Sequence, residues 1–206
     1  MPEVKLTYFN LRARGEPARL ILAYAGVQYE DDRIPAPWDD PKPWSELKPK
    51  TPYGEVPILY WDGVEIAQSL GVARFLAREF GLVGDNNIEA AQVDEIIYAL
   101  QDALNAGYYA LFEEDEERKK KMKETHENVT IPRVLTQIEN RLKKRGGEFL
   151  VGDKLSWADL QTFFFCSELE DKEVLKKTPG VESLVKKIGD IPAISAWVEK
   201  RPKTSL

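Results

Sequence analysis

The stretch of sequence that decides the fold is Thr51-Pro52-Tyr53-Gly54-Glu55-Val56-Pro57-Ile58-Leu59, followed by Gln68-Ser69 at the start of a helical pattern. Proline cannot donate to a sheet ladder, and it restricts the residue before it. The prolines therefore predict a fixed turn, and a cis Val56–Pro57 bond would fix it further. Such a turn would leave the Val56 peptide groups free to pair with an extended peptide. Ser69 would add a hydroxyl and free helix amides for a carboxylate. The stretch therefore predicts a receptor for a small acidic peptide.

The residues around this stretch predict a small mixed sheet with flanking helices. Apolar residues at helical spacing favour helices, β-branched and aromatic runs favour strands, and Asp62-Gly63 is a strong hairpin turn. The proline-rich residues 35–44 are expected to form loop or short turns. The expected elements are a strand at 4–9, a helix at 16–25, strands at 28–34, 57–61 and 64–66, and a helix at 69–80. This β-α-β-loop-β-β-α order suits an α/β domain.

From residue 88 onward the sequence predicts helices only. Pro132 should kink the second of two long amphipathic patterns. Ser156-Trp157-Ala158-Asp159 is a capping signature, in which Ser156 is the N-cap and Asp159 reaches back to its amide. The expected helices cover residues 88–112, 115–145, a segment from 156 onward, 179–187 and 192–201. Gly84-Asp85-Asn86-Asn87 breaks the periodicity, so the expected domains are residues 1–80 and 88–206, with a linker at 81–87.

The amino-acid composition limits the kinds of partner and the kinds of catalytic or metal site that we expect in this chain. The net charge of -6 argues against nonspecific binding to nucleic acid or to an anionic membrane. No apolar run is long enough to span a bilayer, and the first residues do not resemble a signal peptide. A single cysteine, Cys166, excludes disulfides within the chain, and a single histidine, His126, argues against a triad or a histidine-rich metal site. We expect Cys166 to be buried, His126 to be exposed, and the cytosol to be the compartment.

Several short motifs, taken in order and at their spacing, resemble one known family. They are Lys5-Leu6-Thr7-Tyr8-Phe9-Asn10 with Arg12 and Arg14, Pro52-Tyr53-Gly54-Glu55-Val56-Pro57-Ile58-Leu59, Gln68-Ser69, Ser156-Trp157-Ala158-Asp159 and Lys200-Arg201-Pro202-Lys203-Thr204. The chain resembles the cytosolic glutathione transferases over essentially its whole length, and within them the sigma class, which includes prostaglandin D synthases and lens S-crystallins. The resemblance implies a thioredoxin-like N-terminal domain, a mixed four-stranded sheet with flanking helices, followed by an all-helical C-terminal domain that contributes the hydrophobic cosubstrate site.

The resemblance also implies that Tyr8 is the catalytic residue. A phenol that donates a hydrogen bond to sulfur stabilises the thiolate of glutathione over the thiol, which lowers the pKa of that thiol. Arg14, at the head of the first helix, is the cation that the resemblance puts nearby. Taken alone, Tyr8 would read as an ordinary strand aromatic; the accompanying motifs favour the catalytic role.

A site for glutathione, the implied cosubstrate, follows from the same resemblance. Val56, beside Pro57, would pair its backbone with the cysteinyl unit, and Lys48 would pair with the glycine carboxylate. Trp44 has the better spacing for the aromatic contact at the glycine end. Extra residues in this region leave Trp38 open as the alternative.

The γ-glutamyl end of glutathione is assigned to Gln68 and Ser69, although Ser69 could also serve as a simple helix cap. Asp102 matches an acid that reaches the γ-glutamyl amine from the neighbouring subunit of a homodimer, and a solvated helix acid is its alternative. No metal is expected, because the acid cluster linked to metal activation in the synthases is reduced here to Asp102 beside Tyr98 and Gln101.

A small hydrophobic electrophile is the implied second substrate. The resemblance assigns its pocket to Phe9, Arg12, Tyr108 and Tyr109, of which Tyr109 stands where the synthases carry a tryptophan. Three functions stay open: conjugation of glutathione to such electrophiles, glutathione-dependent isomerisation to prostaglandin D₂, and a crystallin-like protein that binds glutathione with little turnover. The intact Tyr8, Arg14, Gln68 and Ser69 speak against the crystallin-like function.

Overall fold

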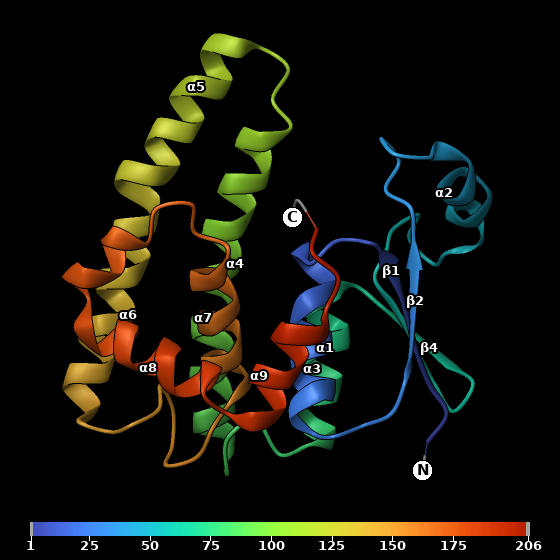
Figure 1. Cartoon of the computed structure of the whole chain (residues 1–206). Helices are drawn as coiled ribbons and strands as arrows, with labels where there is room; N and C mark the ends of the chain where they lie inside the picture. The colour runs from blue at the N-terminus through green and yellow to red at the C-terminus, as the bar shows by residue number, and fades with distance from the viewer. Residues whose placement is uncertain (1, 205–206) are drawn as a thin grey trace. The chain divides into compact units, whose positions relative to one another are not determined.

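The computed structural model describes residues 2–204 and divides them into two compact units (Figure 1). The first unit holds the residues up to Phe80 together with those from Ile191 onward, and the second is Gly81–Asp190. The expected division put residues 88–206 in one domain and therefore differs from this grouping in its last segment. The reason is packing: helix α9 (Pro192–Lys200) lies against helix α1 (Glu16–Tyr24) of the first unit.

The first unit is built on the expected four-stranded mixed sheet, and the strands lie in the order β2-β1-β3-β4. The strands are β1 (Val4–Phe9), β2 (Glu30–Ile34), β3 (Ile58–Trp61) and β4 (Val64–Ala67). Strand β1 runs parallel to β2 and antiparallel to β3, and β3 runs antiparallel to β4. Asp62 and Gly63 both have positive φ, at 48° and 78°, which is the backbone twist of a two-residue hairpin turn.

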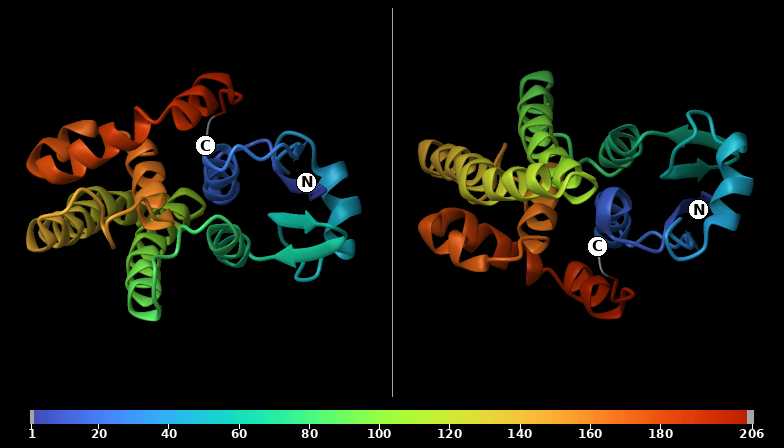
Figure 2. Two further views of the ribbon diagram at one scale, coloured as in Figure 1. Left: turned by 90° about the horizontal axis from the view of Figure 1, so that it is seen from below. Right: turned by 90° about the horizontal axis from the view of Figure 1, so that it is seen from above.

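Helices cover both faces of this sheet (Figure 2). Helix α1 and helix α3 (Ser69–Glu79) pack together on one face, where Leu20 and Leu76 are fully buried. Helix α2 (Pro41–Leu47) lies on the opposite face. Two short 3₁₀ turns, η1 (Ala13–Gly15) and η2 (Lys48–Lys50), precede α1 and follow α2.

The expectation that residues 35–44 form only loop or short turns is wrong for its second half. Asp40 caps helix α2 by accepting the Lys42 backbone N–H at 3.1 Å, and Pro41 occupies the first helical position. A proline is tolerated there because the amide it lacks would have no partner within the helix.

Every regular element that the structure describes between Gly81 and Asp190 is a helix. These are α4 (Asn87–Leu111), α5 (Glu116–Thr125), the π-helical turn η3 (His126–Thr130), α6 (Ile131–Arg145), α7 (Trp157–Ser167), the 3₁₀ turn η4 (Lys172–Lys177) and α8 (Pro179–Gly189). The interruption expected at Pro132 is present, as the π turn that ends just before it. The capping box of Ser156 and Asp159 is also present, and it starts the central helix α7.

Candidate functional site

Tyr8 lies near the end of β1, and its hydroxyl is already engaged by the main chain. The ring is buried, with 4% exposure, and its hydroxyl oxygen accepts the Arg14 backbone N–H at 3.2 Å. The Tyr8 hydroxyl hydrogen is thereby left to be donated to another group. Burial raises the pKa of the Tyr8 phenol, although the Arg14 N–H and the positive charges of Arg14 and Arg19 oppose the rise. Tyr8 is therefore a neutral hydrogen-bond donor at physiological pH.

Gly15 determines where the Tyr8 ring can lie, and the sequence motifs did not single it out. A Cβ atom at Gly15 would overlap the edge of the ring and lie 2.8 Å from its Cγ. Glycine in the turn before α1 thus lets the phenol approach the backbone closely. A glycine directly after a predicted catalytic arginine is the one signal in the sequence that could have pointed to this contact.

A row of aromatic rings runs from Tyr8 to the short helix α2. The Phe9 ring lies 5.6 Å from that of Tyr8, and the Trp44 ring meets Phe9 edge-on at 5.2 Å, both measured between centroids. Trp44 is half-buried by this contact, whereas Trp38 is 55% exposed. The structure thus brings Trp44, and through it α2, to the tyrosine.

The turn before β3 contains the Val56–Pro57 peptide bond, whose isomer the sequence left open. The Val56–Pro57 peptide bond is cis. Val56 is partly exposed, and within residues 2–204 no backbone hydrogen bond joins it to another residue. Lys48 lies beside the same turn, because a Cβ atom at Gly54 would stand 3.5 Å from its Cε.

Gln68 and Ser69 follow at the start of α3. Gln68 is exposed, has a φ of 71°, unusual for a residue other than glycine, and donates through Nε2 to Glu55 Oε2 at 3.1 Å. Gln68 occupies the N-cap position, and Ser69 is the first helical residue. Ser69 is therefore not the N-cap residue of α3, and it lies next to the first amides of the helix, which have no partner within the helix.

Two further predicted residues, Phe9 and Arg12, also belong to the first unit. Phe9 contacts both neighbouring aromatic rings, as described above. Arg12 is half-buried and donates through Nη1 to the Thr204 carbonyl oxygen at 3.2 Å. The C-terminal residues therefore contact the loop between β1 and α1.

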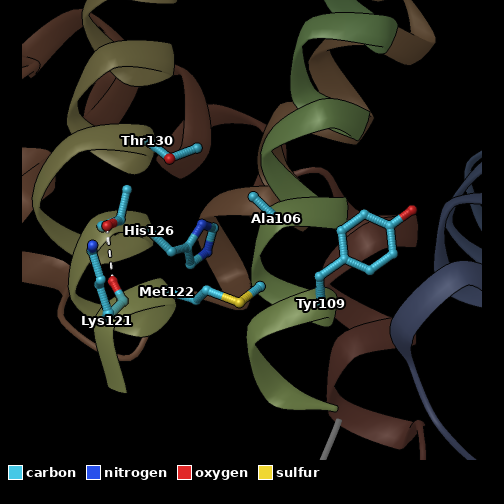
Figure 3. Close-up of a pocket in the computed structure, with 7 residues that line it drawn as sticks. Ala106, Tyr109, Lys121, Met122, His126 and Thr130 are labelled. Carbon is cyan, nitrogen blue, oxygen red and sulfur yellow. Dashed lines mark hydrogen bonds between the residues drawn. The ribbon is translucent and has the colours of Figure 1, made fainter. Parts of the chain in front are cut away.

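The remaining predicted residues belong to the second unit, all on α4. Asp102 is exposed, Tyr108 is half-buried, and Tyr109 is 65% exposed. Tyr109 lines a pocket of about 340 Å³ between α4 and the α5–η3 segment (Figure 3). The other lining residues are Ala106, Lys121, Met122, Thr125, His126 and Thr130.

His126 is half-buried rather than exposed, which corrects the sequence expectation. Its imidazole packs on Gly107 of α4, where a Cβ atom would come within 2.8 Å of Nε2. Nδ1 is buried without a partner among the described residues, and burial lowers the pKa of the ring. The charged residues around His126 predict an exposed side chain. The contact with Gly107 depends on packing against α4, which the local sequence does not show.

Three further observations concern the cysteine, metal ligands and membrane-spanning helices. Cys166 is fully buried, as expected, and burial raises the pKa of its thiol to about 12, which suppresses the reactive thiolate. Residues 2–204 contain no cluster of three or more histidine, cysteine or acidic side chains that could hold a metal ion. Within the same residues, no helix has both the length and the apolar character to cross a membrane.

Comparison with known proteins gives matches to both units. A family model described as glutathione S-transferase, N-terminal domain, matches residues 4–78, and one described as glutathione S-transferase, C-terminal domain, matches residues 101–201. The chain is 38% identical to hematopoietic prostaglandin D synthase of Gallus gallus over 209 residues, which cover 100% of both proteins. It is 37% identical to glutathione S-transferase 1 of Ascaris suum over 214 residues, with 99% of each covered.

A solved structure with a similar fold is that of monomeric Na-GST-3, a glutathione S-transferase from Necator americanus. It superposes with a TM-score of 0.89 at 32% identity and covers 99% of this chain and 100% of its own.

Proposed function

This chain belongs to the glutathione S-transferase family, and from that premise we propose that it conjugates glutathione to small hydrophobic electrophiles through a thiolate held by Tyr8. One observation carries the proposal: the Tyr8 hydroxyl accepts from the Arg14 backbone N–H, so its own hydrogen is free for a ligand sulfur. A buried neutral phenol in this position acts as a donor to the thiolate. Glutathione is the cosubstrate.

The energy that Tyr8 must supply is within reach of a hydrogen bond. A free thiol titrates near ~8.5, and lowering that pKa by about two units requires about 3 kcal/mol of differential stabilisation. A hydrogen bond to a charged group contributes about 1.5–3 kcal/mol. The Arg14 charge, at the head of α1, is proposed to supply the rest.

The tripeptide is proposed to lie along the edge formed by α2, the Val56 turn and the start of α3. The unpaired Val56 backbone would bond the cysteinyl unit, and Lys48 with Trp44 would hold the glycine end. Gln68, Ser69 and the first amides of α3 would bind the γ-glutamyl carboxylate.

Outside this edge, three groups of residues complete the proposal. Asp102, exposed on α4, would reach the γ-glutamyl amine of a partner subunit. Phe9, Arg12, Tyr108 and Tyr109 would line the electrophile site. The reaction needs no covalent intermediate with the protein: the thiolate forms a sulfur–carbon bond as the leaving group departs, and the protein positions both reactants.

The experiment is conjugation of glutathione to a chloronitrobenzene by the wild type, Tyr8→Phe and Tyr24→Phe. Tyr24 ends α1 and is 36% exposed, so it controls for loss of a tyrosine hydroxyl elsewhere. We expect Tyr8→Phe to raise the pKa of the bound thiol by about two units and to lower turnover at neutral pH about 100-fold. No turnover by the wild type would reject the proposed activity. Full activity of Tyr8→Phe would reject the role of Tyr8.

A second candidate is glutathione-dependent isomerisation of prostaglandin H₂ to prostaglandin D₂. It is favoured by the full-length similarity to the avian protein named as a prostaglandin D synthase. Formation of prostaglandin D₂ without chloronitrobenzene conjugation would make it the principal activity. Absence of both activities, with glutathione still bound, would instead support a crystallin-like protein.

We further propose a homodimer in the cytosol. Tyr53, beside the Val56 turn, is 69% exposed and is the residue expected to anchor the partner. The similar hookworm structure is described as monomeric, so the two states must be separated by sedimentation of the wild type and Tyr53→Ala. The single, buried cysteine suits a reducing compartment, which subcellular fractionation can test.

A further inference from the structure

Arg19 is a fully buried arginine on α1, directly behind the Tyr8 ring. Its side chain has 0% exposure, and a buried guanidinium is costly unless its donors and its charge are met. The guanidinium Cζ lies 5.7 Å from the centroid of the Tyr8 ring, within the range of a cation–π contact. Arg19 therefore holds a positive charge over the Tyr8 ring.

The donors of Arg19 hold the backbone that follows Tyr8. Nη1 donates to the Leu11 carbonyl oxygen at 2.6 Å, and Nη2 approaches the Phe9 carbonyl oxygen at 3.5 Å. Nε donates to Asp31 Oδ1 at 2.9 Å, which fixes the orientation of the fork. The planar guanidinium thus fixes both the ring and the chain beyond it, which lysine could not do with a single ammonium group.

Glu16 is a second carboxylate near Arg19, in addition to Asp31, and it is itself held by Trp197 of α9 and by Arg201 just beyond that helix. Its side chain has 0% exposure, and its Oε2 lies 3.7 Å from Arg19 Nη1. Its Oε1 accepts from Trp197 Nε1 at 2.8 Å and from Arg201 Nη1 at 2.6 Å. Two residues at the end of the chain therefore orient the carboxylate that faces the arginine behind Tyr8.

We infer that Arg19 is a positioning residue for Tyr8, and that Trp197 and Arg201 act on the same tyrosine through Glu16. The inference rests on the proposed role of Tyr8 in holding the thiolate. A cation against the ring favours the negative charge that the phenol shares when it donates to sulfur. A fixed ring also keeps the hydroxyl where the Arg14 N–H and the ligand sulfur can both reach it.

Three variants separate positioning from packing. Arg19→Lys keeps a positive charge and an aliphatic stem but loses the fork that holds Phe9 and Leu11. Trp197→Phe removes the indole donor to Glu16 and keeps a smaller aromatic ring. Arg145→Lys is the matched control: Arg145 lies in the second unit, bonds the Gly152 carbonyl at 2.7 Å and pairs with the exposed Asp153.

The measured quantities are the pKa of the bound glutathione thiol, turnover, glutathione affinity and unfolding temperature. The thiol pKa is determined from the ultraviolet absorbance of the thiolate. For Arg19→Lys we expect the thiol pKa to rise by about one unit and turnover at pH ~6.5 to fall about tenfold. Glutathione affinity should change less than about threefold, because the tripeptide contacts lie elsewhere. Trp197→Phe should have a smaller effect of the same kind: the thiol pKa should rise by about 0.3–0.6 units, and turnover should fall about two- to fourfold.

The inference is overturned if Arg19→Lys and Trp197→Phe both keep the thiol pKa and the turnover of the wild type and only their unfolding temperature falls. Arg19 would then be a packing residue. Tyr8→Phe, measured alongside, keeps the two proposals apart. An unchanged thiol pKa in Tyr8→Phe would overturn the proposed function itself. If Arg19→Lys does not fold, the conservative Trp197→Phe decides alone, and a thiol pKa equal to that of the wild type counts against the inference.

Discussion

The Arg14 backbone N–H donates to the Tyr8 hydroxyl oxygen over 3.2 Å, so the two residues proposed for catalysis are joined through the main chain of one of them. Because this contact uses only the backbone, the donor N–H is kept when the Arg14 side chain is replaced by that of any residue except proline. It also ties the direction of the Tyr8 hydroxyl to the conformation of η1, the turn that contains Arg14 and Gly15. Changes that move this turn should therefore act on Tyr8.

Gly15→Ala should impair catalysis while leaving the tripeptide contacts intact. The new methyl group would overlap the Tyr8 ring and force the phenol or the turn to move. Because misplacing a reacting group by about 1 Å can cost 100-fold, we expect kcat/KM for chloronitrobenzene to fall between about 10- and 100-fold. Glutathione affinity, measured by calorimetry, should change much less.

Gly26→Ala is the control for this substitution. Gly26 has a φ of 67° and open space around its Cα, so alanine there adds backbone strain of about 1–2 kcal/mol without touching Tyr8. Equal losses of activity in the two variants would show that general destabilisation, rather than displacement of the tyrosine, is responsible.

The elements of the first unit other than α2 could be predicted because the interactions that determine them are local. The hairpin follows from Asp62 and Gly63, and the turn before β3 follows from Pro57. The sequence did not predict helix α2, because prolines usually break helices. Pro41, however, follows the N-cap residue Asp40, and proline is a favourable first residue of a helix.

The surroundings of the site could not be predicted, since they depend on contacts between distant parts of the chain. Glu16 and Trp197 are 181 positions apart, and nothing in either local sequence announces their hydrogen bond. His126 likewise lies in a charged segment that the sequence predicts to be exposed, and its contact with Gly107 makes it half-buried. The sequence pattern shows which face of a helix is apolar, but it does not show which polar group of another element contacts that helix.

Trp44→Phe should weaken glutathione binding more than Trp38→Phe. Trp44 is in contact with Phe9, next to Tyr8, whereas Trp38 is 55% exposed. We expect the KM for glutathione to rise about fivefold for Trp44→Phe and to stay within about twofold for Trp38→Phe. The reverse order would assign the glycine end of the tripeptide to Trp38.

Tyr29→Phe should stabilise the protein, most strongly in alkali. The Tyr29 hydroxyl is buried without a hydrogen-bond partner among the described residues, so removing it should gain about 1 kcal/mol. Burial, with Asp31 as the second cause, raises the pKa of Tyr29 above its ordinary value of 10.0. The unfolded chain therefore ionises first, and stability falls as pH rises above about 10.

Urea unfolding at pH ~8 and ~10.5 checks this, because the loss of stability between the two should be smaller in Tyr29→Phe than in the wild type. Tyr24→Phe, at an exposed position, should keep the full loss. A Tyr29→Phe protein less stable than the wild type at pH ~8 would mean that the hydroxyl has a water partner that compensates its burial.

Asp159→Ala should be strongly destabilising. Asp159 Oδ2 accepts the Ser156 N–H at 2.8 Å and the Ser156 hydroxyl at 2.7 Å, and Oδ1 accepts the Leu150 N–H at 2.9 Å. Alanine leaves these buried donors unmet, at a cost of about 1–3 kcal/mol each, so chemical denaturation should show a loss of at least about 3 kcal/mol. Asp153→Ala, which removes a fully exposed acid, should produce no measurable loss.

His126→Gln should reduce the sensitivity of the fold to mild acid. Burial lowers the pKa of His126 below its ordinary value of 6.5, with Glu127 opposing the shift. The folded protein then holds the imidazole neutral while the unfolded chain takes up a proton below pH ~6.5, so stability that is full above that pH declines as pH falls through it. Glutamine fills similar space without titrating.

Unfolding free energies at pH ~7.5 and ~5.5 give the comparison, and their difference should shrink in His126→Gln. Gly107→Ala provides a second route to the same change, because its methyl group would displace the ring from α4 and return it toward solvent. That variant should be less stable at both pH values yet show the smaller pH dependence. If His126→Gln retains the full decline between the two pH values, other acids cause it, and the contact between His126 and Gly107 carries no pH sensitivity.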